Sequence, residues 1–207
     1  ASLKALAIDH RSQFEEMAER AGADRDRIAG FKLLAVEAAA KVADGRDGFG
    51  MLLDEKYGRA ALFAAAKVPD FWIGRPVELP GSRPLKFEFS QDMGSRLVEW
   101  PVDHTIKCLA FFHPDDPDDM RLEQTEKLGA LYDAARSVGR EVLIEIIAGK
   151  NGPMEADTVP RVLTELYSAG IKPDWWKLEP QADAAAWTLI DETIAANDPW
   201  CRGVVLL

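Results

Sequence analysis

Two lysines and one glutamate stand inside short apolar runs of the sequence, where ionisable side chains are uncommon. Lys107 lies in the run 105–112, Glu145 lies in the run 142–147, and Lys177 follows two tryptophans. An amine that is partly desolvated and close to a second cation has a lowered pKa, so a fraction of it is neutral and attacks carbonyl carbons. A carboxylate within reach then moves the protons of the carbinolamine and aldol steps. These residue types therefore indicate Schiff-base chemistry with Lys177 as the nucleophile.

The elements that position these residues are predicted from hydrophobic periodicity. Short β-like apolar runs alternate with longer segments of helical period, which is typical of βα units feeding a parallel sheet. The stretch 79–101 is rich in Pro, Gly and Ser, and we expect a long loop with a short helical piece there. The predicted strands are 3–8, 49–53, 71–78, 105–112, 142–147, 175–179 and 202–207, and the predicted helices are 12–42 with a break near 22–24, 59–67, 121–138, 158–169 and 184–196.

This alternation favours an α/β fold of the (β/α)₈ TIM-barrel type, of which residues 1–207 form a single, partial domain. The last apolar run has no closing helix, so we expect a barrel truncated after strand seven. The competing fold is an open doubly wound sheet, which would place a glycine-rich phosphate turn after an early strand. Neither GxGxxG nor GxxxxGK[ST] occurs in the chain.

Active sites of such barrels form at the C-terminal ends of the strands, where side chains alternate between the interior and the outside. Arg75 ends the third strand, and its planar fork suits a substrate carboxylate, although it could instead pair with the neighbouring Glu78. Lys150 follows the fifth strand on a loop, where it either holds an anionic group or is simply solvated. The candidate substrate-binding residues are Asp9, Asp54, Arg75, Lys150 and Glu179.

Composition excludes several classes of partner. The net charge of -10 argues against nucleic acid and anionic membranes, so a phosphorylated substrate needs a local positive pocket. Cys108 and Cys201 are expected to be reduced core thiols of a cytoplasmic protein. No apolar stretch approaches the roughly 20 residues of a membrane span. Asp9, His10, His113 and Glu145 could ligate a metal in a metal-dependent lyase, but with 3 histidines in the chain we expect neither metal nor cofactor.

Several longer motifs resemble a known family over essentially the whole chain. They are IDHR at 8–11, WIGRPVELPGS at 72–82, KCL at 107–109 followed by HPDD at 113–116, EII at 145–147 and WWKLEP at 175–180. Together they resemble the aldolase-like C-terminal domain of the bacterial bifunctional 5-dehydro-2-deoxygluconokinase / 5-dehydro-2-deoxyphosphogluconate aldolase of myo-inositol catabolism. More distantly, the lysines and glutamates of the fourth to sixth strands look like the pattern of tagatose-1,6-bisphosphate aldolase.

The resemblance implies a class I aldolase, an aldehyde-lyase of carbohydrate metabolism. Its implied substrate is a phosphorylated keto-sugar acid, 5-dehydro-2-deoxy-6-phosphogluconate, which is cleaved to dihydroxyacetone phosphate and malonate semialdehyde. By the same resemblance, Lys177 forms the Schiff base, Glu145 is the general acid and base, and Lys107 depresses the pKa of Lys177 and holds substrate oxygens. A fused sugar kinase domain upstream is implied, and an oligomer is compatible with it. In barrels the phosphate commonly sits on loops after strands seven and eight, so the activity of this segment alone is left open.

An alternative is a noncatalytic sugar-phosphate-binding domain attached to a sugar kinase. Such a domain would bind the ligand without turnover. The sequence favours the lyase, because a binding module has no need for an acid and two lysines that face one cavity.

Overall fold

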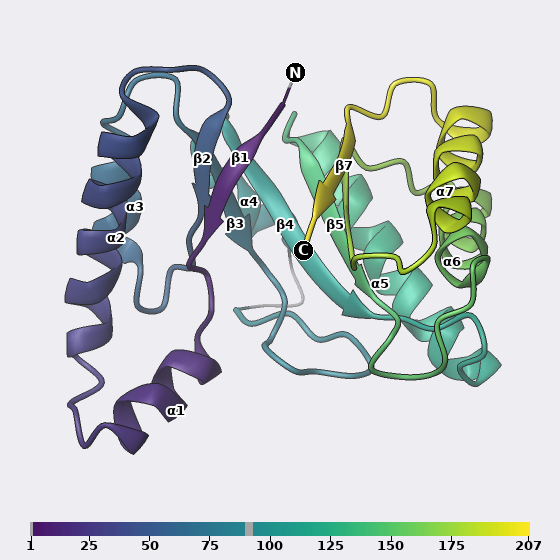
Figure 1. Cartoon of the computed structure of the whole chain (residues 1–207), viewed down its shortest axis with the longest axis horizontal. Helices are drawn as coiled ribbons and strands as arrows, with labels where there is room; N and C mark the ends of the chain where they lie inside the picture. Colours follow the sequence, from purple (N-terminus) through teal and green to yellow (C-terminus); the bar gives the residue numbers. More distant parts are fainter. Residues whose placement is uncertain (1, 90–92) are drawn as a thin grey trace. The chain divides into compact units, whose positions relative to one another are not determined.

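The computed structural model describes residues 2–89 and 93–207 and has an α/β fold in which seven strands alternate with helices (Figure 1). The strands are β1 (Lys4–Ala7), β2 (Phe49–Leu52), β3 (Trp72–Pro76), β4 (His104–Phe111), β5 (Val142–Ile147), β6 (Trp175–Leu178) and β7 (Gly203–Leu206). The helices are α1 (Ser12–Arg20), α2 (Arg27–Ala43), α3 (Arg59–Ala65), α4 (Met93–Val98), α5 (Asp118–Ser137), α6 (Thr158–Ser168) and α7 (Ala184–Asn197).

These elements confirm the predicted alternation, and their ends follow from local chemistry. The chain turns at Gly22, with φ of 61°, between α1 and α2, where the break in the long predicted helix was expected. Gly139 and Gly170 follow α5 and α6 with φ of 67° and 83°, a left-handed conformation that glycine adopts without a Cβ clash. The short helix predicted within 79–101 is α4, while residues 90–92 of that stretch lie outside the described residues.

The hydrogen-bonded order of the strands follows the chain from β1 to β7 without a reversal. The pairs β1–β2, β2–β3, β5–β6 and β6–β7 are parallel. A doubly wound sheet reverses its strand order at a switch point, and this order does not. The sequential order is the one that a β/α barrel requires.

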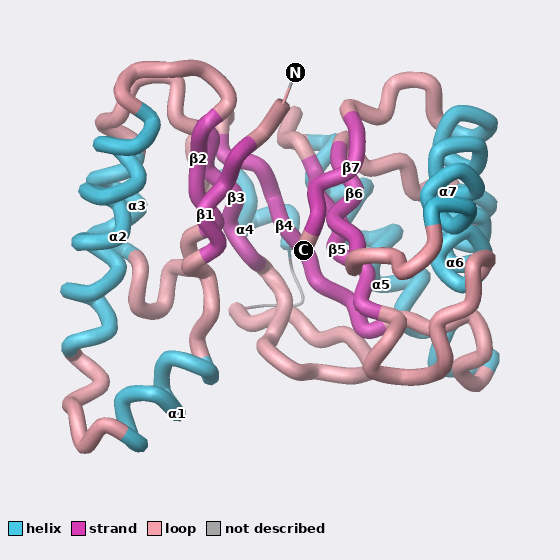
Figure 2. Tube along the Cα trace, viewed as in Figure 1, coloured by secondary structure: helices cyan, strands magenta, loops and turns pink. Residues whose placement is uncertain are grey.

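The backbone contacts divide the chain into two compact units, 1–76 with 103–106 and 77–102 with 107–207, so that β4 contributes residues to both. The single domain over residues 1–207 stays a prediction. In the first unit, α2 and α3 lie along the same face of β1, β2 and β3 (Figure 2). Its core is built from apolar residues of these five elements and the turns after them: Ile8, Val36, Met51, Leu53, Ala61, Leu62, Ala65 and Ile73.

The second unit has its most deeply buried strand in β5, all of whose residues are buried. Burial along the whole length of the strand is typical of a parallel strand that is covered on both faces. On β6, Trp176 is fully buried and donates a hydrogen bond of 2.7 Å from Nε1 to the hydroxyl of Tyr167 on α6. Within the described residues of both units, no helix combines the length and the apolar character that crossing a membrane demands.

Candidate active site

Three adjacent strands of the second unit each carry one charged residue between buried apolar neighbours. Lys107 lies on β4, Glu145 on β5 and Lys177 on β6, and their exposed fractions are 3%, 2% and 8%. Glu145 and Lys177 are directly opposite in the parallel register of β5 and β6. Because successive side chains of a strand point to opposite faces, this register puts the carboxylate and the amine on the same face.

The carboxylate of Glu145 lies between the two lysine ammonium groups. Its Oε1 accepts a hydrogen bond of 3.0 Å from Nζ of Lys177. Its Oε2 is 3.0 Å from Nζ of Lys107, with which it forms an ion pair. One acid is therefore in contact with two amines, and the structure brings together the three residues that were predicted to be catalytic.

A fourth side chain, that of Glu78, extends this arrangement from the segment that follows β3. Its Oε1 accepts a hydrogen bond of 3.0 Å from Nζ of Lys107, and its Oε2 accepts one of 3.1 Å from the backbone N–H of Leu109. We call Glu78, Lys107, Glu145 and Lys177 the charge row. Two anions alternate with two cations, so the row is neutral, and burial of the four charges is tolerated because each has an opposite partner.

Cys108 lies next to this row on β4. Its side chain is fully buried, and burial together with the charge of Glu78 holds the pKa of its thiol well above the usual value. The thiol therefore stays protonated, and the predicted place of this cysteine in the core is confirmed.

Two of the predicted substrate-binding residues lie in the same unit, on the loops that follow β5 and β6. Oε2 of Glu179 accepts hydrogen bonds of 2.8 Å from the backbone N–H groups of both Ala148 and Gly149. Its carboxylate therefore anchors the loop that carries Lys150. The Lys150 side chain is exposed, with Nζ 5.3 Å from the ring centroid of Phe111. Of these two residues, Lys150 is the one placed to meet an anionic group from solution.

The other three predicted substrate-binding residues belong to the first unit. Arg75 is buried, and its Nη2 donates a hydrogen bond of 2.8 Å to Oε2 of Glu55. Asp9 is 6% exposed and Asp54 is fully buried. Oδ2 of Asp54 accepts a hydrogen bond of 2.8 Å from the backbone N–H of Tyr57.

Sequence reasoning missed Lys32, which is fully buried on α2. Its Nζ donates hydrogen bonds of 2.7 Å and 2.8 Å to the carbonyl oxygens of Ile8 and His10, and it forms an ion pair with Asp54. Burial lowers the pKa of Lys32, and the carboxylate of Asp54 opposes that shift. The signal in the sequence is the buried stripe of Ile28, Lys32 and Val36 at spacings of four residues.

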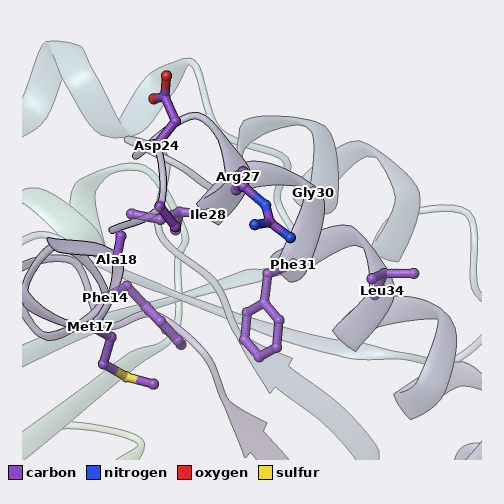
Figure 3. Close-up of a pocket in the computed structure, with 10 residues that line it drawn as sticks. Phe14, Met17, Ala18, Asp24, Arg27, Ile28, Gly30, Phe31 and Leu34 are labelled. Carbon is purple, nitrogen blue, oxygen red and sulfur yellow. The ribbon is translucent and has the colours of Figure 1, made fainter. Parts of the chain in front are cut away.

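The first unit also has a groove of about 510 Å³ between α1 and α2 (Figure 3). Its wall is mostly apolar, with Phe14 and Phe31 at a ring-centroid distance of 5.4 Å. Asp24 and Arg27 are the charged side chains among its lining residues. None of the candidate catalytic residues lines it, so this groove offers packing surface and no acid–base pair for catalysis.

The candidate metal ligands do not come together in the described residues. In the described parts of the chain, 2–89 and 93–207, no three or more His, Cys, Asp or Glu residues cluster as a metal site would require. His113, which was a candidate ligand, is buried instead against the loop after β5, with Nε2 3.1 Å from the carbonyl oxygen of Pro153.

Comparison with known proteins gives a family for this chain. No curated protein matches it significantly. A family model matches residues 1–207, and the chain belongs to that family, DUF2090, which is described as an uncharacterized protein conserved in bacteria.

Proposed function

We propose that the chain is a class I aldolase of the (β/α)₈-barrel type, which cleaves a carbon–carbon bond through a Schiff base on Lys177. The observation that carries this proposal is the single carboxylate of Glu145 in contact with two buried lysines, at 3.0 Å from each Nζ. A salt bridge that served stability alone would need one amine. The sequential strand order supports the barrel.

The reaction begins with proton transfer between two groups that are already hydrogen-bonded. Lys177 passes its ammonium proton to Glu145, and the neutral amine attacks the ketone carbon. Glu145 returns the proton to the carbinolamine hydroxyl, which leaves as water and yields the iminium. The iminium withdraws electrons while a base removes the proton of the substrate hydroxyl, so that the carbon–carbon bond breaks to an aldehyde and an enamine.

Lys107 stays positively charged in this scheme because it lies between two carboxylates. As an ammonium ion it stabilises negative charge that develops on substrate oxygens. Lys150 is the candidate for binding a phosphate from solution. The motif resemblance supports 5-dehydro-2-deoxy-6-phosphogluconate as the substrate, with dihydroxyacetone phosphate and malonate semialdehyde as products, in myo-inositol catabolism.

The test is reductive trapping of the Schiff base. The protein is incubated with dihydroxyacetone phosphate, reduced with sodium borohydride, and mapped by peptide mass spectrometry. An adduct on Lys177 is expected, and Lys177→Met should abolish it. Lys172→Met is the matched control, since Lys172 is an exposed lysine of the same unit whose Nζ donates to the carbonyl oxygen of Asn197.

Two other outcomes reassign the function. Binding of dihydroxyacetone phosphate without any adduct, shown by ligand-dependent shifts in protein NMR spectra, would favour the noncatalytic sugar-phosphate-binding domain. Loss of aldol cleavage after treatment with a chelator would favour a metal-dependent lyase, because a Schiff-base enzyme is not affected by a chelator.

A further inference from the structure

Glu78 contributes to the charge row through both of its carboxylate oxygens, which contact one strand. Oε1 is 3.0 Å from Nζ of Lys107, while Oε2 is 3.1 Å from the backbone nitrogen of Leu109, two residues further along β4. The backbone contact fixes the carboxylate to the strand that carries Lys107. A buried carboxylate held at two points cannot turn away when charges elsewhere in the row change.

The proton transfer in the proposed reaction does change those charges. At rest, Lys107 has two carboxylate partners, Glu78 and Glu145. When Glu145 takes the proton of Lys177, it becomes neutral, and Lys107 keeps Glu78 as its negative partner. Without Glu78, the same transfer would take from the buried ammonium ion the carboxylate that is hydrogen-bonded to it, and the loss of a partner from a buried ion pair is strongly unfavourable.

We propose that Glu78 is a positioning residue of this site: its carboxylate keeps Lys107 a charge-compensated ammonium ion while Glu145 holds the proton. The inference rests on the proposed Schiff-base function and adds to it a residue that takes no part in the proton transfer itself. It acts through Lys107.

Two residues beside the row on neighbouring positions carry no charge. On β4, Cys108 is a buried thiol that stays protonated. On β7, the residue opposite Lys177 in the register is Val205, which does not titrate. In the described part of the chain, the ion pairs of Glu145 are those with Lys107 and Lys177, both of which belong to the row.

The expected effect follows from distance. The carboxylates of Glu78 and Glu145 are each 3.0 Å from the same Nζ of Lys107, so their nearest oxygens are at most about 6 Å apart. At that separation a unit charge shifts a titration by about 1–3 pH units. Glu78→Gln leaves the row with an excess positive charge, so the pH profile of Schiff-base formation should move to lower pH by at least about one unit. Lys107→Met leaves an excess negative charge and should move the profile to higher pH.

The experiment measures the rate of adduct formation with dihydroxyacetone phosphate from about pH 5 to pH 9. Samples are reacted at each pH and then quenched with excess borohydride in one common buffer, so that the reduction step is the same for all. The double variant Glu78→Gln/Lys107→Met is neutral again and should return the profile to that of the wild type. Glu165→Gln is the matched control, because it removes one carboxylate and its ion pair with Arg121 from the same unit.

The outcomes separate this inference from the function on which it rests. Opposite shifts for the two single variants, with return in the double variant, support it. Two results for Glu78→Gln overturn the role of Glu78 while the Lys177 adduct in the wild type still stands. One is a pH profile of adduct formation with lower rates and an unchanged midpoint, and the other is a profile that moves to higher pH. If Glu78→Gln does not fold, the double variant Glu78→Gln/Lys107→Met provides the test. A pH profile of adduct formation in the double variant that is displaced from that of the wild type overturns the inference. Absence of an adduct in the wild type overturns the proposed function and this role together.

Discussion

The charge row can be tested for charge compensation by removing Lys107 and Glu78 singly and together. Lys107→Met leaves the carboxylates of Glu78 and Glu145, whose side chains are 5% and 3% exposed, with Lys177 as the remaining cation of the row. Glu78→Gln leaves one anion, Glu145, with two cations, so the row has an excess of positive charge. Removal of one partner from a buried pair costs about 3–5 kcal/mol, because the other charge remains buried.

The double variant behaves differently because it leaves the balanced pair of Glu145 and Lys177. At 3.0 Å and an effective dielectric constant of about 20, the gross attraction between Lys107 and Glu78 is about 5–6 kcal/mol. Measured couplings between residues in contact reach about 3 kcal/mol. We therefore expect a coupling of about 3 kcal/mol, so that the double variant loses about 3–7 kcal/mol, whereas additive losses would amount to about 6–10 kcal/mol.

The assay is urea unfolding followed by tryptophan fluorescence, to which the buried Trp176 on β6 contributes. With a slope of about 2 kcal/mol per M, each single substitution should lower the midpoint by about 2 M. The control cycle uses Glu16 and Arg20, whose side chains are 67% and 76% exposed and 3.9 Å apart, and its coupling should stay below about 0.5 kcal/mol. Additive losses in the buried cycle would refute compensation as the reason that these charges are tolerated.

Three further predictions concern other buried groups. Lys32→Met should destabilise the protein by about 3–5 kcal/mol, since it leaves Asp54 buried without its cation. Burial lowers the folded-state pKa of Lys32 below the ordinary value of 10.5, so the unfolded chain binds more protons than the folded chain as the pH is raised toward 10.5. The urea midpoint of the wild type should therefore rise relative to that of Lys32→Met over that range, and a decrease in the difference between the two midpoints would contradict this. Gly50→Ala should lower the melting temperature sharply, because the added Cβ would lie 2.2 Å from a backbone oxygen of β3. In the control Gly30→Ala on α2, the added Cβ meets nothing within 4 Å, so this substitution should stabilise the protein by up to about 1 kcal/mol. Similar changes in melting temperature for the two variants would be inconsistent with the packing. Cys108 should resist iodoacetamide in the folded protein at about pH 8 and react once urea is added, as followed by mass spectrometry, and rapid labelling without urea would show that the strand is accessible.

The sequence was sufficient to predict the strands and the three residues that meet in the charge row. A strand has a side-chain period of two, so an ionisable residue within an apolar run must face its neighbours across the sheet or be left unpaired. This constraint brings Lys107, Glu145 and Lys177 together without knowledge of any other contact. It works because all three lie on adjacent strands whose order follows the chain.

The contacts that the sequence did not predict depend on groups whose direction is not encoded locally. Lys32 is held by two backbone carbonyls after β1, and carbonyl orientation in a loop follows from the folded path of the chain. The sequence suggests the nearby Arg75 as a partner of Glu78, and it gives no sign that the carboxylate of Glu78 binds Lys107, which is 29 positions away. Likewise, Arg75 has Glu55 as a partner. In each case several partners of suitable charge were within reach by sequence, and only the three-dimensional arrangement selects among them.

The direct opposition of Glu145 and Lys177 on β5 and β6 also bears on how the chain avoids misfolding. A slip of one residue between these strands would place Lys177 opposite Ile144 or Ile146 and turn the acid and the amine to opposite faces. Lys177 would then be buried in apolar surroundings, at a cost of several kcal/mol, while Glu145 would lose one of its two lysine contacts and keep the one with Lys107. Runs of isoleucine, leucine and valine alone would tolerate that slip far better. The same two residues that are proposed to carry out the chemistry therefore discriminate against incorrectly aligned strands while the protein folds.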